Sequence, residues 1–331
     1  MKQRRYFTAA PYLVLLIMLV LIPILVDNQY YLGIITSILV DIILAISLWF
    51  IISTGQVTLG HAAFASIGAY VSAALVSVYG QSSLIGLLAA IAIAAIVATI
   101  IGYITLRITG IYFLVVTLAF GEIVRIFFGM VEHPFGGLNG LINLPAPDPI
   151  PFPGLGAIHF VSKQSLYYLI MISTILCAVI LHRLHQSQVG MVHKSISQAD
   201  NLAEHVGINI MAYKIKAFVL GSMFAGLAGV LYTYINKSIL TSCFTLEQST
   251  IYLLYVVVGG EANIAGPIMG AIILNILSVI LRPIQEFVPI IYGLLLIAAV
   301  IFFRGGVLSL VQNAKHQVVT LVRNSHLMNQ T

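Results

Sequence analysis

The sequence has few charges, few cysteines and no recognisable catalytic motif. Only 8% of its residues are charged, whereas soluble globular domains average about a quarter. Its two cysteines, Cys177 and Cys243, form no CxxC pair and no cluster with metal-ligand spacing. The chain has no G-x-x-x-x-G-K-[ST] phosphate loop, no H-E-x-x-H motif and no nucleophile elbow. We therefore expect neither an enzyme nor a cofactor in this chain, so any energy source lies in a partner or an ion gradient.

Apolar residues take the place of the missing charges. They make up 60% of the chain, and the mean hydropathy is +1.06. Apolar runs long enough to cross a hydrocarbon layer of about 30 Å recur from end to end. These runs predict an all-α polytopic membrane protein with about ten transmembrane helices, some of them broken or short. The predicted spans are 7–26, 31–52, 61–79, 84–106, 110–131, 166–184, 214–235, 249–260, 266–281 and 287–303.

The positive charges are distributed unevenly between the two sides of these spans. If the N-terminus lies inside, eleven lysines and arginines fall on the inner side and four on the outer side, which together are the fifteen of the chain. This asymmetry obeys the positive-inside rule and leaves no need for a nucleic-acid partner. We expect both termini to be cytoplasmic, the first apolar run to be kept as a span, and residues 309–331 to form a cytoplasmic tail after a membrane domain of residues 1–308.

Two segments outside the spans are long enough to have structure. The outer one, residues 132–160, carries six of the eleven prolines and is predicted to be an ordered but irregular lid. The inner one, residues 193–209, reads HKSISQADNLAEHVGIN. Ser195 and Gln198 have the spacing of a capping box, and Gly207 is suited to closing a helix. An apolar stripe follows the helical period, formed by Ile196, Ala199, Leu202, Ala203 and Val206.

The opposite side of this predicted cytoplasmic helix is polar. It carries Gln198, Asp200, Asn201, Glu204 and His205. Helices that rest on lipid favour lysine and arginine on the exposed side, whereas Asp200 and Glu204 are acidic and four residues apart. The composition therefore favours a protein partner over a lipid surface.

Two stretches that connect predicted spans are poor candidates for continuous lipid-facing helices. The first, STGQVTLGH, contains Thr54, Gly55, Gln56, Thr58, Gly60 and His61. The second, GGEANIAGP, contains Gly259, Gly260 and Asn263. Because irregular backbone at membrane depth must be covered by protein or reached by water, both stretches are predicted helix breaks that line a path or an interface.

A few further polar residues fall inside the predicted spans. Asp41 lies near the middle of the second span and is a candidate for the path, a subunit interface or a partnered structural carboxyl. Glu122 and Arg125 are three residues apart and are interpreted as a structural pair. His61 is interpreted as a hydrogen-bonded histidine rather than a proton relay.

Four blocks in order resemble the ABC importer permeases for branched-chain amino acids, specifically the LivM-type subunit. They are STGQVTLGHAAFASIGAYVSA; LRITGIYFLVVTLAFGEIVRIFF followed by GGLNGL; QVGMVHKSISQADNLAEHVGINIMAYKIKAFVLGSMFAGLAGVLY; and VVVGGEANIAGPIMGA ending in YGLLLIAAVIFFRGGVL. The resemblance spans roughly residues 31 to 308. It implies that the 193–209 segment is a coupling helix that docks into a separate ATPase.

The resemblance also implies an assembly and a location. The partners would be a second, different permease subunit, two ABC ATPase subunits that bind ATP, and a periplasmic or lipid-anchored solute-binding protein. The chain would be a multi-pass protein of the bacterial inner membrane and form half of a path for a small neutral or zwitterionic solute, with branched-chain amino acids expected. Urea or another small solute is an alternative, as is an autonomous secondary transporter or channel that uses Asp41 and the unwound glycines.

Overall fold

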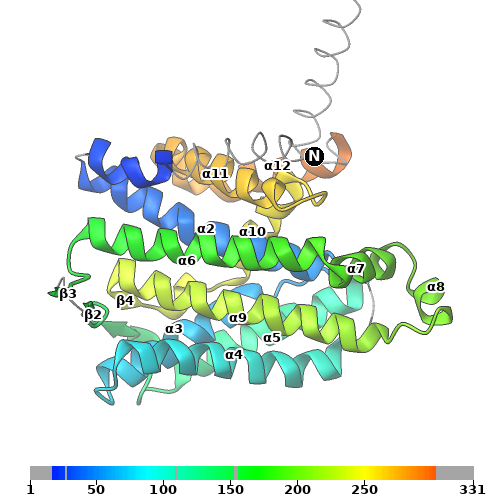
Figure 1. The fold of residues 1–331 in the computed structure, drawn as a ribbon, viewed down its shortest axis with the longest axis horizontal. Helices are drawn as coiled ribbons and strands as arrows, with labels where there is room; N and C mark the ends of the chain where they lie inside the picture. The colour runs from blue at the N-terminus through cyan, green and yellow to red at the C-terminus, as the bar shows by residue number, and fades with distance from the viewer. Residues whose placement is uncertain (1–16, 27, 109, 153–155, 303–331) are drawn as a thin grey trace, which may run out of the picture.

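The computed structural model describes residues 17–26, 28–108, 110–152 and 156–302, and these form an all-α bundle with short strands at one end (Figure 1). Helices lie at nine of the predicted spans. They are α2 Gln29–Ile52, α3 His61–Ser77, α4 Ser83–Thr105, α5 Ile111–Met130, α6 Lys163–Gln186, α9 Ile210–Asn236, α10 Leu246–Gly259, α11 Ala265–Ile280 and α12 Val288–Phe302. The other helical segments after α2 are η1 Gly137–Asn139, α7 Gln188–Gln198, α8 Asp200–His205, η2 Thr241–Cys243 and η3 Arg282–Phe287.

The number of membrane crossings is only partly settled by these helices. Within the described residues, five helices are long and apolar enough to cross a membrane, namely α2, α4, α5, α6 and α9. Helix α3 and helices α11 and α12 are apolar but shorter. Residues 17–25 are helical, but the first predicted span begins outside the described residues, as do the predicted C-terminal tail and its boundary. The chain is a multi-pass helical membrane protein, and ten crossings remain a prediction.

Helix α9 is at the centre of the bundle, where it packs against α2, α3 and α4. Glycine allows these close contacts because a Cβ at Gly68 of α3 would lie 2.1 Å from the carbonyl oxygen of Gly226, and a Cβ at Gly229 would lie 1.9 Å from that of Ala65. Gly221, Ala225 and Gly229 lie four residues apart along α9, and this stripe of small residues is a helix-packing surface.

The two ends of the bundle differ in structure. One end holds α7 and α8, whereas the other holds the strands (Figure 1). Strand β1 Leu141–Ile142 pairs antiparallel with β4 Ser238–Ile239, and β2 Ile150–Phe152 pairs antiparallel with β3 Gly156–Ile158. The predicted irregular segment 132–160 is free of α-helix where it is described, although its short strands were not predicted.

A reciprocal hydrogen-bond pair fixes this irregular segment to the bundle. The Ser83 amide donates to Asp148 Oδ2 at 2.6 Å, and the Asp148 amide donates to Ser83 Oγ at 2.9 Å. Ser83 is the first residue of α4, and the amides of a helix's first turn have no acceptor within the helix. The segment is therefore held in place despite its lack of regular structure.

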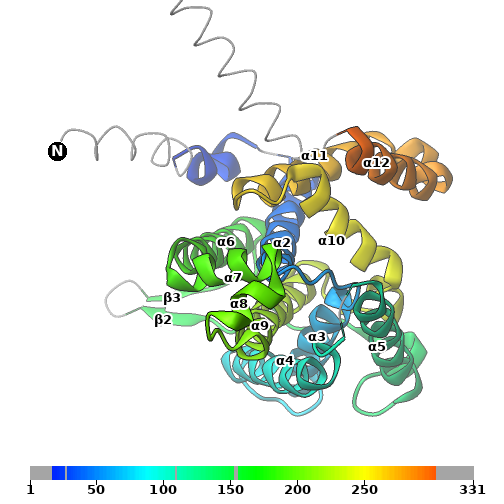
Figure 2. The same cartoon turned by 90° about the vertical axis from the view of Figure 1, so that its right-hand side faces the viewer.

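Helices α10 and α11 form a tight pair on one side of the bundle. A Cβ at Gly259 would lie 1.9 Å from the Gly266 carbonyl oxygen, and one at Gly270 would lie 2.0 Å from the Tyr255 carbonyl oxygen. Viewed along the bundle, α10 runs obliquely across it, and α5, α10 and α12 border the same side (Figure 2). This arrangement places the start of α10 beside α3 and α5.

Candidate functional site

The segment predicted as one coupling helix is two helices, and its start was predicted in the wrong place. Helix α7 begins at Gln188 and is capped by Ser187, whose side chain accepts a hydrogen bond from the Val189 amide at 3.2 Å. Ser195 lies inside α7, and its hydroxyl donates to the Met191 carbonyl at 3.0 Å. The capping-box interpretation was wrong because Ser187 already satisfies the helix start, which leaves Ser195 in the third turn.

Residue Ala199 separates the two helices and changes the orientation of the apolar stripe. Its φ of −161° and ψ of 93° are extended, so the helical period does not continue from α7 into α8. Ile196 and Ala203 are buried, whereas Leu202 and Val206 remain 67% and 79% exposed. Leu202 and Val206 are therefore apolar side chains that remain on the surface, because no other part of the described chain covers them.

The polar residues of this segment have different surroundings. Gln198, Asn201, Glu204 and His205 are exposed, as expected of a polar side. Asp200, in contrast, accepts a hydrogen bond from Lys214 Nζ at 2.6 Å, and only 4% of the Lys214 side chain is exposed. One of the two acidic groups assigned to a partner is thus an internal tether between α8 and α9.

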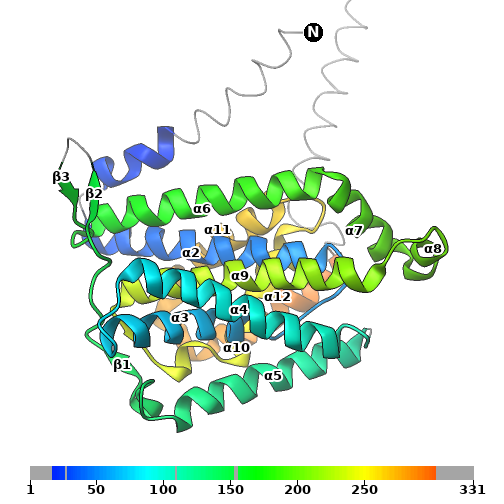
Figure 3. The same ribbon diagram turned by 60° about the horizontal axis from the view of Figure 1, so that its bottom comes forward.

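Gly207 closes α8 as predicted. Its φ is +84°, in the left-handed region that favours glycine, and its amide donates to the Glu204 carbonyl at 2.8 Å. Between α8, the end of α4 and the start of α9 lies an open cleft of about 560 Å³, which is lined by Arg107, Asp200, Glu204 and Lys214 among others. Figure 3 shows α8 at the extreme end of the molecule, beyond α7 and α9.

The first predicted helix break is present between α2 and α3. Thr54, Gln56 and Thr58 are buried, at no more than 3% exposure. At the end of the break and the start of α3, backbone amides find partners in neighbouring elements: the Leu59 amide donates to Thr117 Oγ1 at 3.2 Å, and the Ala62 amide donates to Ser249 Oγ at 3.1 Å. The break is therefore covered by protein, as irregular backbone in a membrane protein must be unless it is reached by water.

This break is in direct contact with α7. Gly55 has a φ of +82°, and a Cβ there would lie 3.2 Å from Ser197 Cα. Ser53 Oγ and His193 Nδ1 are hydrogen-bonded at 3.2 Å. His193 is fully buried, and this burial, together with the nearby charge of His185, lowers its pKa to about 4. A neutral histidine thus joins the α7 segment to the end of α2.

His61 and Gly60 hold the start of α3. His61 Nε2 is hydrogen-bonded to Ser47 Oγ at 2.8 Å in a fully buried position, which agrees with its interpretation as a hydrogen-bonded histidine. A Cβ at Gly60 would lie 2.8 Å from the Thr117 carbonyl oxygen. Glycine is therefore needed here for the close approach of α5.

The second predicted break connects α10 and α11. Gly260 has a φ of +102°, and the Asn263 side chain accepts a hydrogen bond from the Ala265 amide at 3.2 Å. Trp49 of α2 donates through Nε1 to the Glu261 carbonyl at 2.9 Å. Because Trp49 is three residues before the end of α2, it links the second break to the helix that leads into the first.

Asp41 lies apart from both breaks. It is partly buried between α2, α10 and α11, and Tyr255 Oη donates to its carboxylate at 3.4 Å. Asn275 in turn donates to Tyr255 Oη at 3.1 Å. The structure therefore gives Asp41 polar partners, but it does not bring Asp41 together with the other predicted path residues.

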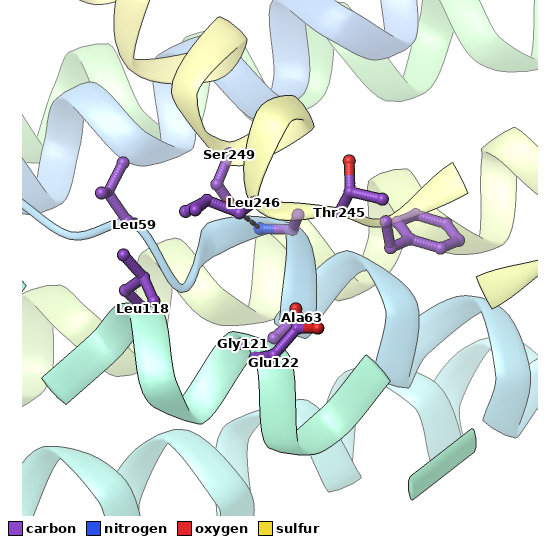
Figure 4. Close-up of a pocket in the computed structure, with 10 residues that line it drawn as sticks. Leu59, Ala63, Leu118, Gly121, Glu122, Thr245, Leu246 and Ser249 are labelled. Atoms are coloured by element: carbon purple, nitrogen blue, oxygen red, sulfur yellow. Dashed lines mark hydrogen bonds between the residues drawn. The ribbon is translucent and has the colours of Figure 1, made fainter. Parts of the chain in front are cut away.

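Glu122 and Arg125 form the predicted ion pair, with Arg125 Nε donating to Glu122 Oε1 at 2.8 Å. Glu122 also lines a very small cavity of about 10 Å³, room for about one water molecule, between α3, α5 and the start of α10 (Figure 4). The other lining residues are Leu59, Ala62, Ala63, Leu118, Gly121, Phe244, Thr245, Leu246 and Ser249. This cavity combines one carboxylate with a mainly apolar wall.

Sequence reasoning missed several residues of these sites. Ser187, His193, Lys214 and Ser249 all make contacts that fix the breaks or the α7–α8 segment. Ser187 carried a local signal, because a serine directly before a helix is a favoured cap. The other three contact residues that are 14 to 187 positions away, and no local spacing indicates such pairs.

Comparison with known proteins agrees with this architecture. The family model described as "Branched-chain amino acid transport system / permease component" matches residues 30–303. The chain is 26% identical over 291 residues to the high-affinity branched-chain amino acid transport system permease protein LivM of Escherichia coli, covering 82% of this chain and 68% of LivM. The LivM of Salmonella typhimurium gives the same values.

A shorter match and the solved structures complete the comparison. A probable branched-chain amino acid transport permease protein LivM of Methanocaldococcus jannaschii is 28% identical over 115 residues, which are 34% of this chain and 33% of that protein. No solved structure gives a significant match. Since the family model covers most of the chain, from α2 to α12, the protein belongs to the permease-component family of branched-chain amino acid transport systems.

Proposed function

We propose that this chain is one permease subunit of an ABC importer in a bacterial inner membrane, with both termini in the cytoplasm. It would form half of the path for a small neutral or zwitterionic solute, for which branched-chain amino acids are the best candidates. The names of the relatives support this solute class. The scarcity of charge in the spans supports it as well, because a path for metal ions or polyanions needs ionic ligands.

The observation that carries the proposal is the position and composition of α8. It projects from one end of the molecule and exposes apolar Leu202 and Val206 beside polar Asn201 and Glu204 (Figure 3). A mixed surface of this kind suits a protein partner better than water or lipid. We infer that the partner is an ATPase subunit, which would bind the ATP that this chain has no motif to bind.

The contacts of α7 offer a route by which such a partner could act on the path. Motion of α7 would reach the first break through the Gly55–Ser197 contact and the Ser53–His193 hydrogen bond. It would reach the second break through the bond from Trp49 to Glu261. Coupling between ATP binding and the path requires packed elements that connect the two, and the contacts of α7 with the breaks would provide them.

The remaining partners in this proposal are a second, different permease subunit, a second ATPase, and a periplasmic or lipid-anchored solute-binding protein. The family to which the chain belongs, a permease component of a transport system, supports them. Selection of the solute would rest largely with the binding protein. Urea is therefore the solute to test against L-leucine, and an autonomous transporter is the function to test against the importer.

Two experiments test the proposal. Deletion of this chain from its native cells is expected to abolish ATP-dependent uptake of labelled L-leucine and to leave urea uptake unchanged. In solubilised membranes, Leu202→Asp is expected to reduce co-purification of an ATPase subunit at least tenfold, while Leu138→Asp, an exposed leucine at the strand end, is the control that retains it. Uptake of L-leucine driven by an ion gradient in liposomes containing this chain alone would overturn the proposal.

A further inference from the structure

The Glu122–Arg125 pair occupies an unusual position for charged residues. Both lie within the 20-residue helix α5, which is apolar enough to cross a membrane. With a rise of about 1.5 Å per residue, Glu122 is roughly 2 Å and Arg125 roughly 7 Å from the middle of that helix. Their side chains are 40% and 33% exposed. A charged side chain at such depth is costly in lipid, so this flank of α5 is not expected to face hydrocarbon.

The two flanks of α5 differ in character. Ile123 and Phe127, on one flank, are 65% and 51% exposed and suit contact with lipid. The other flank carries Glu122 and Arg125 and adjoins the start of α10, where Leu246 and Ser249 line the same cavity as Glu122 (Figure 4). Glu122 therefore lies on the flank of α5 that meets the start of α10.

A second cavity opens on the same side. It has a volume of about 290 Å³, and its lining includes Leu246, Glu247 and Thr250 of α10 and Tyr292 of α12. Leu246 lines both cavities, so the first turn of α10 lies between them. Helix α4, in contrast with α5, has no charged residue between Ser83 and Thr105, as expected of a helix that faces lipid.

We propose that Glu122 and Arg125 contact the transported solute, and that the solute is a zwitterionic amino acid. This inference rests on the proposed function and deepens it. The solute's ammonium group would bind to Glu122 and its carboxylate to Arg125, in exchange for the bond that the two side chains make with each other. Its aliphatic side chain would lie against Leu246 and Leu254 in the second cavity, which is large enough for it and lined mainly by apolar side chains. Both the pair and the zwitterion have zero net charge, so no charge is left uncompensated.

Uptake kinetics in native cells with chromosomal substitutions test this inference. Hydrogen bonds to charged groups contribute enough that Glu122→Gln and Arg125→Gln are each expected to raise the KM for labelled L-leucine about tenfold or more. Ile123→Ala, on the lipid flank, is the matched control and is expected to keep the wild-type KM. The swapped variant Glu122→Arg with Arg125→Glu separates contact from structure. A structural pair would be restored by the swap, whereas a solute-binding pair stays impaired because the zwitterion would have to reverse against the apolar wall.

Thiol accessibility gives a readout that does not depend on transport. With Cys177 and Cys243 replaced by serine, Glu122→Cys is expected to react with a membrane-impermeant thiol reagent and to react at least several-fold more slowly in L-leucine. Ile123→Cys is expected to stay unreactive. Equal reaction at both positions, or a wild-type KM in the two glutamine variants, would overturn the inference. Unchanged L-leucine uptake after deletion of the whole chain would instead overturn the proposed function.

Discussion

Ser53 at the end of α2 and His193 in α7 are joined by a hydrogen bond of 3.2 Å between Oγ and Nδ1. The two residues are 140 positions apart in the sequence, and one belongs to the helix break whereas the other belongs to the segment at the end of the bundle. Because His193 is fully buried, its bond to Ser53 is protected from water. The bond therefore depends on the protonation state of one imidazole.

Acidification is expected to destabilise the protein through His193. Burial lowers the pKa of this histidine from an ordinary 6.5 to about 4, so below pH 6.5 the unfolded chain binds a proton that the folded chain does not. The contribution of His193 to the free energy of unfolding is therefore fully present above pH 6.5 and falls by about 1 kcal/mol per pH unit as the pH decreases toward 4. Thermal unfolding of the detergent-purified chain across this range measures the effect.

His193→Gln is expected to reduce this pH dependence, because glutamine keeps a polar side chain near Ser53 but binds no proton in this range. His205→Gln, at the exposed end of α8, is the matched control and should retain the wild-type slope. Identical slopes for His193→Gln and the wild type would contradict the assignment.

Gly55 is expected to be required for transport, beyond any effect of its backbone conformation. Gly55 and Gly80 both have positive φ, at +82° and +62°, so alanine at either position strains the backbone by about 1 kcal/mol. Only Gly55 contacts Ser197 of α7, and nothing lies within 4 Å of a Cβ at Gly80. We expect Gly55→Ala to reduce L-leucine uptake at least fivefold and Gly80→Ala to leave it within twofold. Uptake by cells with matched amounts of each variant in the membrane checks this.

Glycine at position 60 is also expected to be required for transport, but for a different reason. Its Cβ would lie 2.8 Å from the Thr117 carbonyl oxygen, so leucine there must displace α5 from the start of α3. We expect Gly60→Leu to abolish uptake and to lower the thermal unfolding temperature, since overpacking costs about 1 to 3 kcal/mol. Normal uptake by this variant would show that the first break is a simple turn.

Local sequence patterns predicted much of the architecture, because a membrane requires long apolar helices and breaks that carry glycine and polar residues. The positions of α2 to α6 and α9 to α12, the two breaks and the closure of α8 at Gly207 could all be inferred in this way. The start of α7 could not, because Ser187 and Ser195 both precede helix-forming residues and only the three-dimensional structure shows which one is the cap.

The pairings between distant elements were also beyond the sequence. Asp200 was assigned to a partner's surface, but Lys214 binds it once α9 has packed beside α8. The contact between Glu122 and Arg125 was predicted. How exposed the pair is beside the start of α10 depends on the position of η2, which precedes α10. Such pairings arise when distant elements pack together, and no local pattern in a single sequence indicates them.

The Asp200–Lys214 ion pair is expected to hold α8 against α9. Lys214 is buried and Asp200 is partly exposed, so Asp200→Asn weakens the attachment by about 1 to 2 kcal/mol rather than by the full cost of a buried pair. Amide hydrogen exchange across residues 200–207 should accelerate about tenfold. Glu204→Gln is the control, since its exposed side chain should leave exchange unchanged. Pairing Asp200→Asn with Lys214→Met should restore much of the protection, because no buried charge then lacks a partner.

The crossing of α3 and α9 is expected to tolerate no side chain at Gly68. An alanine Cβ would lie 2.1 Å from the Gly226 carbonyl oxygen, and the neighbouring atoms at 2.5 and 2.6 Å are also backbone, so no rotamer change can relieve the clash. Gly68→Ala should therefore lower the free energy of unfolding by about 1 to 3 kcal/mol. Gly33→Ala in α2, where nothing lies within 4 Å of the added Cβ, should be neutral or slightly stabilising because alanine favours the helix. Thermal unfolding of the two purified variants in the same detergent compares them directly. Equal unfolding temperatures would mean that the helices at this crossing are further apart than their glycines indicate.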